Sequence, residues 1–361
     1  MKVSAKIICI IAILLILTSC GTGNISEPAS VENFSVESSS VENSVDSSVY
    51  SSLIYEDLQK ISLILDSNYE NGFAVKGLGG DQGTTATVGT FNYLNVSGRP
   101  FWSLAQWTSK YDFMDQSVTT FKELGEGIFR YINPTKEFTV DTKNAILTFG
   151  GIASNCYDSP RASGSDSWFH ILIESTFSMS GNNPDTNVSE LKAVKIKLSS
   201  KLTKFEDKMD GQADPGLHAA QFLMYLNIQN QDVNDPGYGE MIWLGLPIFD
   251  NRYEWLDTSA MYDNGTGAMM YGIGNKKLYM DGANFFDEGA IVAGETSPWI
   301  QIDVDVLNDI KIAYEIARYR GYFKDTDFEE LYISGMNIGW EIPGVYDAEM
   351  QVKDLSVDVY K

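Results

Sequence analysis

Residues 168–174 place an aromatic ring, an imidazole and a carboxylate at alternate positions. Successive side chains of a strand point to opposite faces, so Trp168, His170 and Glu174 share one face. The other face of this strand is wholly apolar and is typical of a core. A face that mixes these three groups suits a polar ligand, because it offers ring surface, a titratable base and a carboxylate together.

Two further stretches carry related mixtures. In 222–230 the polar side chains alternate with core-like ones, and in 102–107 a tryptophan and an amide share a face. Sugars bind to such surfaces, because aromatic rings pack on C–H faces and amides or carboxylates bond paired hydroxyls. We therefore predict a carbohydrate-binding face made of Trp102, Gln106, Arg161, Trp168, His170, Glu174, Tyr225, Asn227 and Gln229.

Each of these residues also has a plain structural interpretation. The tryptophans are then core residues, His170 is a satisfied structural histidine, and residues 225–229 form an ordinary solvated face. A third interpretation is a surface scaffold with a protein partner, which predicts an exposed apolar patch rather than a polar cleft.

Catalysis on the same sandwich is the alternative to binding. A glycoside hydrolase needs two carboxylates, and Glu174 with His170 or Glu341 is the candidate set. The acidic run 325–330 resembles the acidic strand motif of concanavalin-like glucanases, but it starts with Asp and Phe328 interrupts it. A polysaccharide lyase would take acidic substrates, and the net charge of the chain, −23, is a poor background for attracting them.

No metal or cofactor site is predicted. Three Cys and two His argue against a Cys/His zinc site and a disulfide scaffold. The acidic loops 207–214 and 232–235 offer oxygen ligands without a calcium-loop spacing, so a structural Ca²⁺ is kept only as an alternative. Cys156 is expected to fill core space rather than to act as a nucleophile.

The elements that must position these residues are mostly strands. Short alternating segments separated by turn residues, without βαβ spacing, predict an all-β fold: a two-sheet antiparallel sandwich of the jelly-roll, concanavalin-like type. Residues 53–361 are expected to form this one domain. Helices are predicted near 305–320, with Gly321 as C-terminal cap, and near 55–65. Lys195 and Lys197 predict a protected edge strand, with an anionic-glycan patch as the alternative.

Composition limits the partners. Hydrophobic residues make up 43% of the 361, enough for a sizeable core, so disorder throughout is excluded. The excess of Asp and Glu argues against a nucleic-acid partner. The oligomeric state is not predicted.

The N-terminus predicts export. Two lysines precede an apolar run, Ile7 to Leu17, which is too short to span a bilayer and fits a signal peptide over 1–19. The run ends in Leu-Thr-Ser-Cys-Gly, which resembles a bacterial lipobox with Cys20 as the lipidated residue. A Ser-rich acidic tether, 20–52, would follow. The expected location is the outer face of the bacterial cell membrane, with the membrane contacted through the lipid alone.

Four stretches resemble a family of exported bacterial β-sandwich proteins. They are the segments 101–107, 168–174, 237–252 and 337–344, and the resemblance covers most of 70–361. It implies the sandwich fold and a link with polysaccharide handling, and it assigns no catalytic residue.

Overall fold

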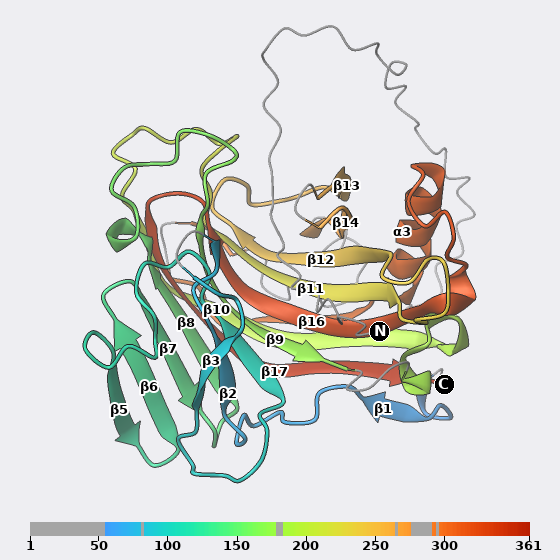
Figure 1. Cartoon of the computed structure of the whole chain (residues 1–361), viewed down its shortest axis with the longest axis horizontal. Helices are drawn as coiled ribbons and strands as arrows, with labels where there is room; N and C mark the ends of the chain where they lie inside the picture. The colour runs from blue at the N-terminus through green and yellow to red at the C-terminus, as the bar shows by residue number, and fades with distance from the viewer. Residues whose placement is uncertain (1–54, 81–82, 178–182, 264–265, 276–290, 294–295) are drawn as a thin grey trace, which may run out of the picture.

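The fold is described from a computed structural model of the chain. The residues it describes are 55–80, 83–177, 183–263, 266–275, 291–293 and 296–361. The predicted signal peptide, Cys20 and the tether lie outside these residues and stay predictions. Two sheets account for most of the regular secondary structure of the described residues and pack through a shared core, so the predicted all-β, two-sheet sandwich is confirmed (Figure 1).

Sheet A has eight strands, and its neighbouring pairs are antiparallel. In spatial order they are β15 (Ile300–Asp305), β10 (Ala193–Asp207), β17 (Tyr346–Tyr360), β8 (Ile146–Ile152), β7 (Lys136–Asp141), β6 (Ile128–Asn133) and β5 (Thr120–Gly125), with β1 (Lys60–Ser62) paired to β17.

Sheet B has nine strands and is mixed, because β12 pairs with β14 and β2 with β4 in parallel. In spatial order they are β13 (Ser259–Tyr262), β14 (Met269–Gly272), β12 (Met241–Asp250), β11 (Gln221–Asn230), β16 (Leu331–Ile342), β9 (Phe169–Thr176), β4 (Trp102–Ala105), β2 (Phe73–Lys76) and β3 (Thr87–Phe91).

Alternation along the strands of sheet B separates a core face from an outer face. On β9, Ile171 and Ile173 are fully buried in the core between the sheets, as are Ile338 and Trp340 on β16. Their neighbours point away from sheet A, and we call this side the outer face of sheet B. The half-buried Cys156 also packs against the core, and burial raises the pKa of its thiol to about 12, which fits the predicted packing role.

The short helix predicted over 55–65 is wrong. Residues 60–62 form β1, whose Ile61 pairs with Val359 of β17, and Lys60 lies 2.9 Å from Asp358 in an ion pair. The reason is the length of β17: β8 pairs only with its residues 347–352, so the rest of that edge is available to another strand.

The edge-strand prediction for Lys195 and Lys197 is also wrong. β10 lies between β15 and β17 and pairs with both. Lys195 is placed between two acidic partners in register, Asp305 and Asp358, and its ammonium group lies 3.0 Å from Asp303. These lysines are therefore matched by carboxylates across the strands instead of repelling a neighbour.

The predicted long helix is α3 (Leu307–Tyr319), which ends as expected before Gly321, a glycine with φ of +82°. Within the described residues no helix is long and apolar enough to cross a membrane. Single 3₁₀ turns occur at η2 (Ala153–Asn155), η3 (Pro184–Thr186), η4 (Val188–Glu190) and η5 (Phe328–Glu330).

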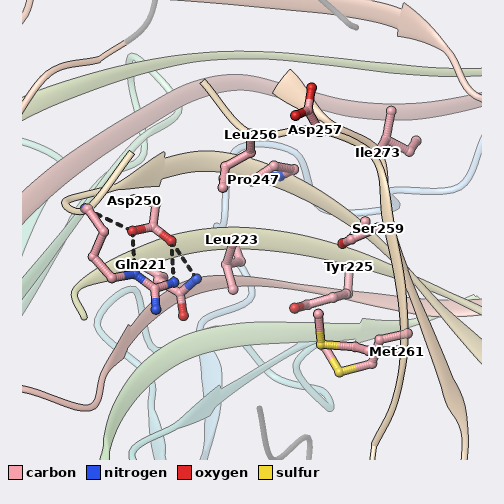
Figure 2. A pocket seen from close by; sticks show the side chains of 14 residues that line it. Gln221, Leu223, Tyr225, Pro247, Asp250, Leu256, Asp257, Ser259, Met261 and Ile273 are labelled. Carbon is pink, nitrogen blue, oxygen red and sulfur yellow. Dashed lines mark hydrogen bonds and ion pairs between the residues drawn. The ribbon is translucent and has the colours of Figure 1, made fainter. Parts of the chain in front are cut away.

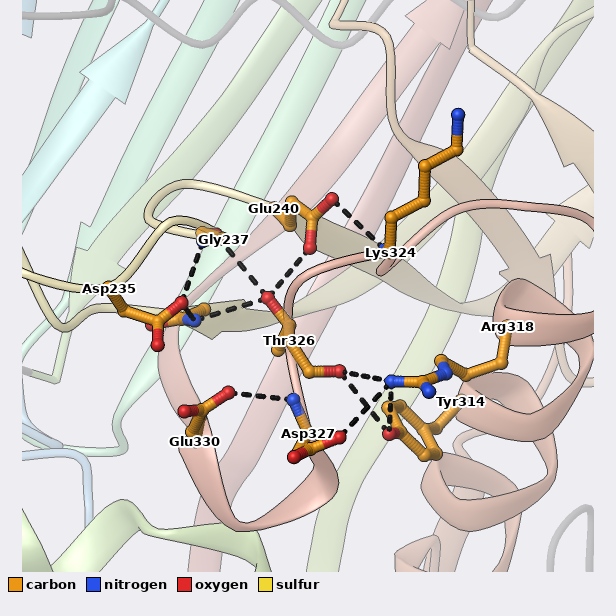
Figure 3. Close-up of polar contacts among 10 residues, drawn as sticks. Asp235, Gly237, Glu240, Tyr314, Arg318, Lys324, Thr326, Asp327 and Glu330 are labelled. Atoms are coloured by element: carbon orange, nitrogen blue, oxygen red, sulfur yellow. Dashed lines mark hydrogen bonds and ion pairs between the residues drawn. The ribbon is translucent and has the colours of Figure 1, made fainter.

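A polar network joins the segment after α3 to the β11–β12 turn (Figure 3). The fully buried Thr326 donates its hydroxyl to Glu240 at 2.7 Å and accepts from the amide of Asn230 at 3.1 Å. Its carbonyl accepts from Arg318 of α3 at 2.8 Å. The acidic run 325–330 thus belongs to a connection that anchors the helix, and Asp327 caps η5.

Thr326→Val should lower the free energy of unfolding by about 1–3 kcal/mol, because it leaves the buried Asn230 and the half-buried Glu240 without the hydroxyl between them. Urea denaturation measures the change. Thr326→Ser keeps the hydroxyl and is the matched control, so equal losses in both variants would contradict the role of the network.

Candidate functional site

A groove of about 410 Å³ lies on the outer face of sheet B. Its lining comes from strands β3, β2, β4, β9, β16, β11 and β12, so the groove crosses the sheet roughly at right angles to the strands. Strand spacing is about 4.8 Å, and the five steps from β11 to β3 therefore cover about 24 Å. The groove is long enough for a chain-like ligand.

Register builds a polar row along the floor of this groove. Glu174 on β9 pairs with Ser103 on β4 and with Asn337 on β16. On β11, Asn227 lies opposite Gly335, two residues from Asn337 on β16, and pairs with Trp243 on β12. All five residues line the groove. Aromatic surface and hydrogen-bonding groups are therefore neighbours, as sugar recognition requires.

Two polar atoms of the groove lining have no hydrogen-bond partner among the described residues. They are the indole Nε1 of Trp107 and the side-chain carbonyl Oδ1 of Asn227. Trp107 is 94% buried, since 6% of its surface is exposed, and its ring packs against Leu172. A buried polar atom without a partner costs about 1–3 kcal/mol. These two atoms are an unsatisfied donor and an unsatisfied acceptor at separate points of the groove lining.

Charge in the groove comes from one carboxylate and two cations among its described lining: Glu174, Lys76 and Arg99. Burial raises the pKa of Glu174, and the positive charge of Lys76 acts in the opposite direction. A half-buried carboxyl group with a raised pKa holds its proton to higher pH and is able to donate a hydrogen bond.

A second cluster lies further along β9 and β16, and the Trp107 ring of the groove lining meets its His170 ring edge-on, with centroids 5.7 Å apart. His170 pairs with Glu341 in register, and their Nε2 and Oε2 atoms are 3.7 Å apart. The Trp168 indole donates to the same carboxyl oxygen at 3.3 Å, and its ring stacks on His170 with centroids 5.5 Å apart. All three side chains are buried.

Burial dominates the titration of this cluster. It raises the pKa of Glu341 to about 7, with a smaller contribution from the charge of Asp263, and it lowers the pKa of His170 to about 4. His170 is therefore uncharged near neutral pH. Its contact with Glu341 is a contact with a neutral imidazole, although the distance lies within ion-pair range.

The candidate catalytic set does not converge. His170 and Glu341 meet, but Glu174 pairs with Asn337, four residues before Glu341 on β16. At 3.3 Å per residue the two glutamates are about 13 Å apart along the strand. Glycoside hydrolysis needs a separation of about 5–9.5 Å between the two carboxyl groups.

The prediction that Trp102 and Gln106 belong to the binding face is wrong. Trp102 is a core residue with 1% of its surface exposed, and its indole donates to the carbonyl of Asp66 at 2.9 Å. Gln106 is fully buried, and its amide bonds the backbone of Lys76 and Phe113. Trp102 lies on the inward side of β4, and Gln106 follows the end of that strand and holds the next loop.

Arg161 is not directed to the groove either. It is 8% exposed, its guanidinium donates to backbone carbonyls of residues 163, 164, 166 and 217, and it covers the Trp168 ring. Together with Trp168 and His170 it forms the buried cluster. Gln229 lies on the outer face but is not part of the groove lining.

Tyr225 lines a separate, mostly apolar pocket of about 150 Å³ beside the groove (Figure 2). At one end of it Asp250 binds Arg252 at 2.6 Å and Gln221 at 2.8 Å. The ring of Tyr225 meets Trp243 edge to face, with centroids 6.0 Å apart. This pair of rings lies between the pocket and the groove.

The structure thus retains Glu174 and Asn227 from the predicted binding set and adds groove residues that were not predicted: Trp107, Trp243, Asn337, Lys76 and Arg99. One of these additional groove residues, Asn337, could have been found from the sequence. Asn337 belongs to the stretch 335–342, in which small or polar residues alternate with Met336, Ile338 and Trp340. That pattern predicts a half-polar strand.

Acidic loops give no support to a calcium site. Across the described ranges, no group of three or more His, Cys, Asp or Glu side chains is placed to hold a metal ion. Asp207 and Asp214 accept from backbone N–H groups two residues further on, as do Asp232 and Asp235. These carboxylates hold their own turns.

No family model matches the chain, and no curated protein matches it. Among solved structures, a cellulase derived from the Cel12A cellulase of Rhodothermus marinus is 12% identical, with 67% of this chain and 96% of that chain covered and a TM-score of 0.35. Endoglucanase 3 of family GH12 from Trichoderma harzianum is 9% identical, covers 85% and 99%, and has a TM-score of 0.32. The family 11 xylanase of Neocallimastix patriciarum is 8% identical, covers 68% and 97%, and has a TM-score of 0.32. These likenesses concern the fold alone.

The titration of Glu341 and His170 makes stability depend on pH, and one variant of each residue separates the two contributions. The stabilising proton on Glu341 is fully present below pH 4.5 and is lost as the pH rises through about 7. Neutral His170 contributes above pH 6.5 and its contribution is lost as the pH falls through about 4. In the wild type the two slopes oppose each other between pH 4.5 and 6.5.

In Glu341→Gln only the His170 contribution is left, so unfolding free energy should rise from pH 4.5 to 6.5 by up to about 1.4 kcal/mol per pH unit relative to wild type. His170→Gln should show the opposite slope up to pH 7. Urea denaturation at a series of pH values measures both. Wild-type slopes in both variants would show that neither group titrates as described.

Proposed function

We propose that the groove on the outer face of sheet B binds a carbohydrate. The observation that carries the proposal is that two groove atoms lack a partner, Trp107 Nε1 and Asn227 Oδ1, and that Asn227 pairs in register with Trp243. A glycan chain carries many hydroxyls that donate and accept, so separate hydroxyls along the groove would satisfy the two atoms, while the C–H face of a sugar ring packs on Trp243. Protein partners prefer an apolar patch, and this lining is mixed.

Binding is favoured over cleavage by the carboxylates. Within the described lining, Glu174 is the one carboxylate of the groove, and Glu341 lies too far along β16 to act with it. Glycoside hydrolysis is the second candidate function, because the raised pKa of Glu174 suits a general acid. A neutral glycan is the first choice of ligand, since the chain carries a net charge of −23.

Asn227→Ala should weaken glycan binding about tenfold, because it removes an acceptor from the groove. Gln229→Ala is the matched control, since Gln229 lies on the same strand and face but outside the groove lining. The measurement is calorimetry of residues 53–361 with cellohexaose, xylohexaose and an oligogalacturonate, after a glycan array.

If the wild type bound none of the neutral or acidic glycans, the proposal would be overturned. Equal losses in the two variants would show that the groove is not the site. The same samples are assayed for new reducing ends. Release of products that is abolished by Glu174→Gln in a folded protein would replace binding with hydrolysis as the function.

We also propose that the chain is a lipoprotein held at the outer face of the bacterial cell membrane. The support is the sequence alone: the basic start, the apolar run and the lipobox ending in Cys20. Two acyl chains anchor a protein firmly, whereas one anchors it marginally. The acidic tether would hold the sandwich away from the anionic surface.

Cys20→Ser should move the full-length protein from the membrane fraction to the soluble exported fraction, because no acyl chain is then attached. Cell fractionation with labelling by a fatty-acid analogue measures both effects. Unchanged membrane association of the unlabelled variant would contradict the lipid anchor. Cys156→Ser is the control for loss of a thiol elsewhere.

A further inference from the structure

A second, wider cleft of about 580 Å³ lies where β3, at the edge of sheet B, meets β5 and β6 of sheet A. Its lining is rich in aromatic side chains, and amide groups of Asn95 and Gln116 lie among them. The carbohydrate-binding face predicted from the sequence includes none of these residues, and the groove residues that carry the proposed function do not extend to them.

Stacked rings form a platform in this cleft. Phe91 and Tyr131 stack with centroids 3.5 Å apart and planes 7° apart. Phe121 packs on Tyr131 at 4.8 Å, yet 49% of its surface is exposed. Phe121 thus packs on Tyr131, which in turn stacks on Phe91, and these contacts hold the exposed ring in place before a ligand binds. Such a supported ring gives contact area at a low cost in conformational entropy.

The cleft and the groove meet at a shared lining residue of the edge strand. Thr90 of β3 lines both of them. On the outer face it pairs with Ala74, which belongs to the same row as Ser103 and Glu174. A chain that follows this row across sheet B therefore reaches the aromatic platform at the edge strand.

We infer that the aromatic cleft is a distal subsite for the same carbohydrate, with Phe121 stacking on a sugar ring beyond Thr90. The inference rests on the proposed function and narrows its ligand class. The groove spans about 24 Å, so one sugar ring does not occupy both sites, and the ligand is an oligosaccharide or polysaccharide. Recognition in the cleft is by ring stacking, which tolerates differences in hydroxyl pattern.

The test uses chain length. Calorimetry is performed on the full-length protein with cello-oligosaccharides and xylo-oligosaccharides from disaccharide to hexasaccharide. For the wild type, affinity should rise about tenfold from the shortest to the longest ligand in the series that binds. Phe121→Ala should reduce the gain for the longest ligands, which reach beyond the groove, while leaving disaccharide affinity within about twofold.

Leu124→Ala is the matched control. Leu124 is 54% exposed on the same strand and does not line the cleft, so its variant should keep the gain with length. Thermal melting shows whether each variant is folded, and Phe121→Tyr, which keeps the ring, should restore the gain.

The two proposals fail differently. If short and long ligands bind and Asn227→Ala weakens both, but Phe121→Ala keeps the gain with length, the distal subsite is overturned and the groove stands. If no glycan of either series binds the wild type, both proposals are overturned. A gain lost equally in Phe121→Ala and Leu124→Ala would place the effect on strand β5 rather than on the ring, and would also overturn the subsite.

Discussion

The register of the central strands of sheet B is the constraint on which the rest of the structure depends. Side chains alternate with period two, so a shift of one residue would exchange the core with the outer face. Trp340 fixes this choice on β16: it is fully buried, and its indole donates across the sandwich to Phe149 of β8 at 2.9 Å. With Trp340 inward, Asn337 and Glu341 must point outward.

Local sequence was sufficient for the fold class and for the outward residues of β9, because alternation is a local property. It was not sufficient to show which tryptophans belong to the core alone and which line the groove. Trp102 and Trp107 lie in one motif and are both almost completely buried. What separates them is the partner of the indole nitrogen: Trp102 bonds Asp66 of a distant loop, and Trp107 lacks a partner among the described residues. That difference depends on tertiary contacts.

Register also explains why the predicted catalytic residues divide into two environments. Glu174 and Glu341 are both carboxyls on the outer face, but β16 runs antiparallel to β9 and places Asn337 beside Glu174. Glu341 instead belongs to the buried cluster with Trp168 and His170. Spacing within each strand was readable from the sequence, whereas the offset between strands far apart in the chain was not.

The net charge of the chain and the charges within the groove act on a ligand over different distances. The chain carries −23, yet Lys76 and Arg99 stand beside Glu174 in the groove lining, and burial raises the pKa of that carboxyl. Salt at about 0.15 M screens charges beyond about 8 Å, so the summed charge slows the approach of an anionic polymer mainly at low salt, whereas the two cations act on groups within the groove. The net charge therefore disfavours acidic glycans through their association rate. In the proposed binding mode, contacts with Trp107, Asn227 and the two cations would then decide the affinity of a seated ligand.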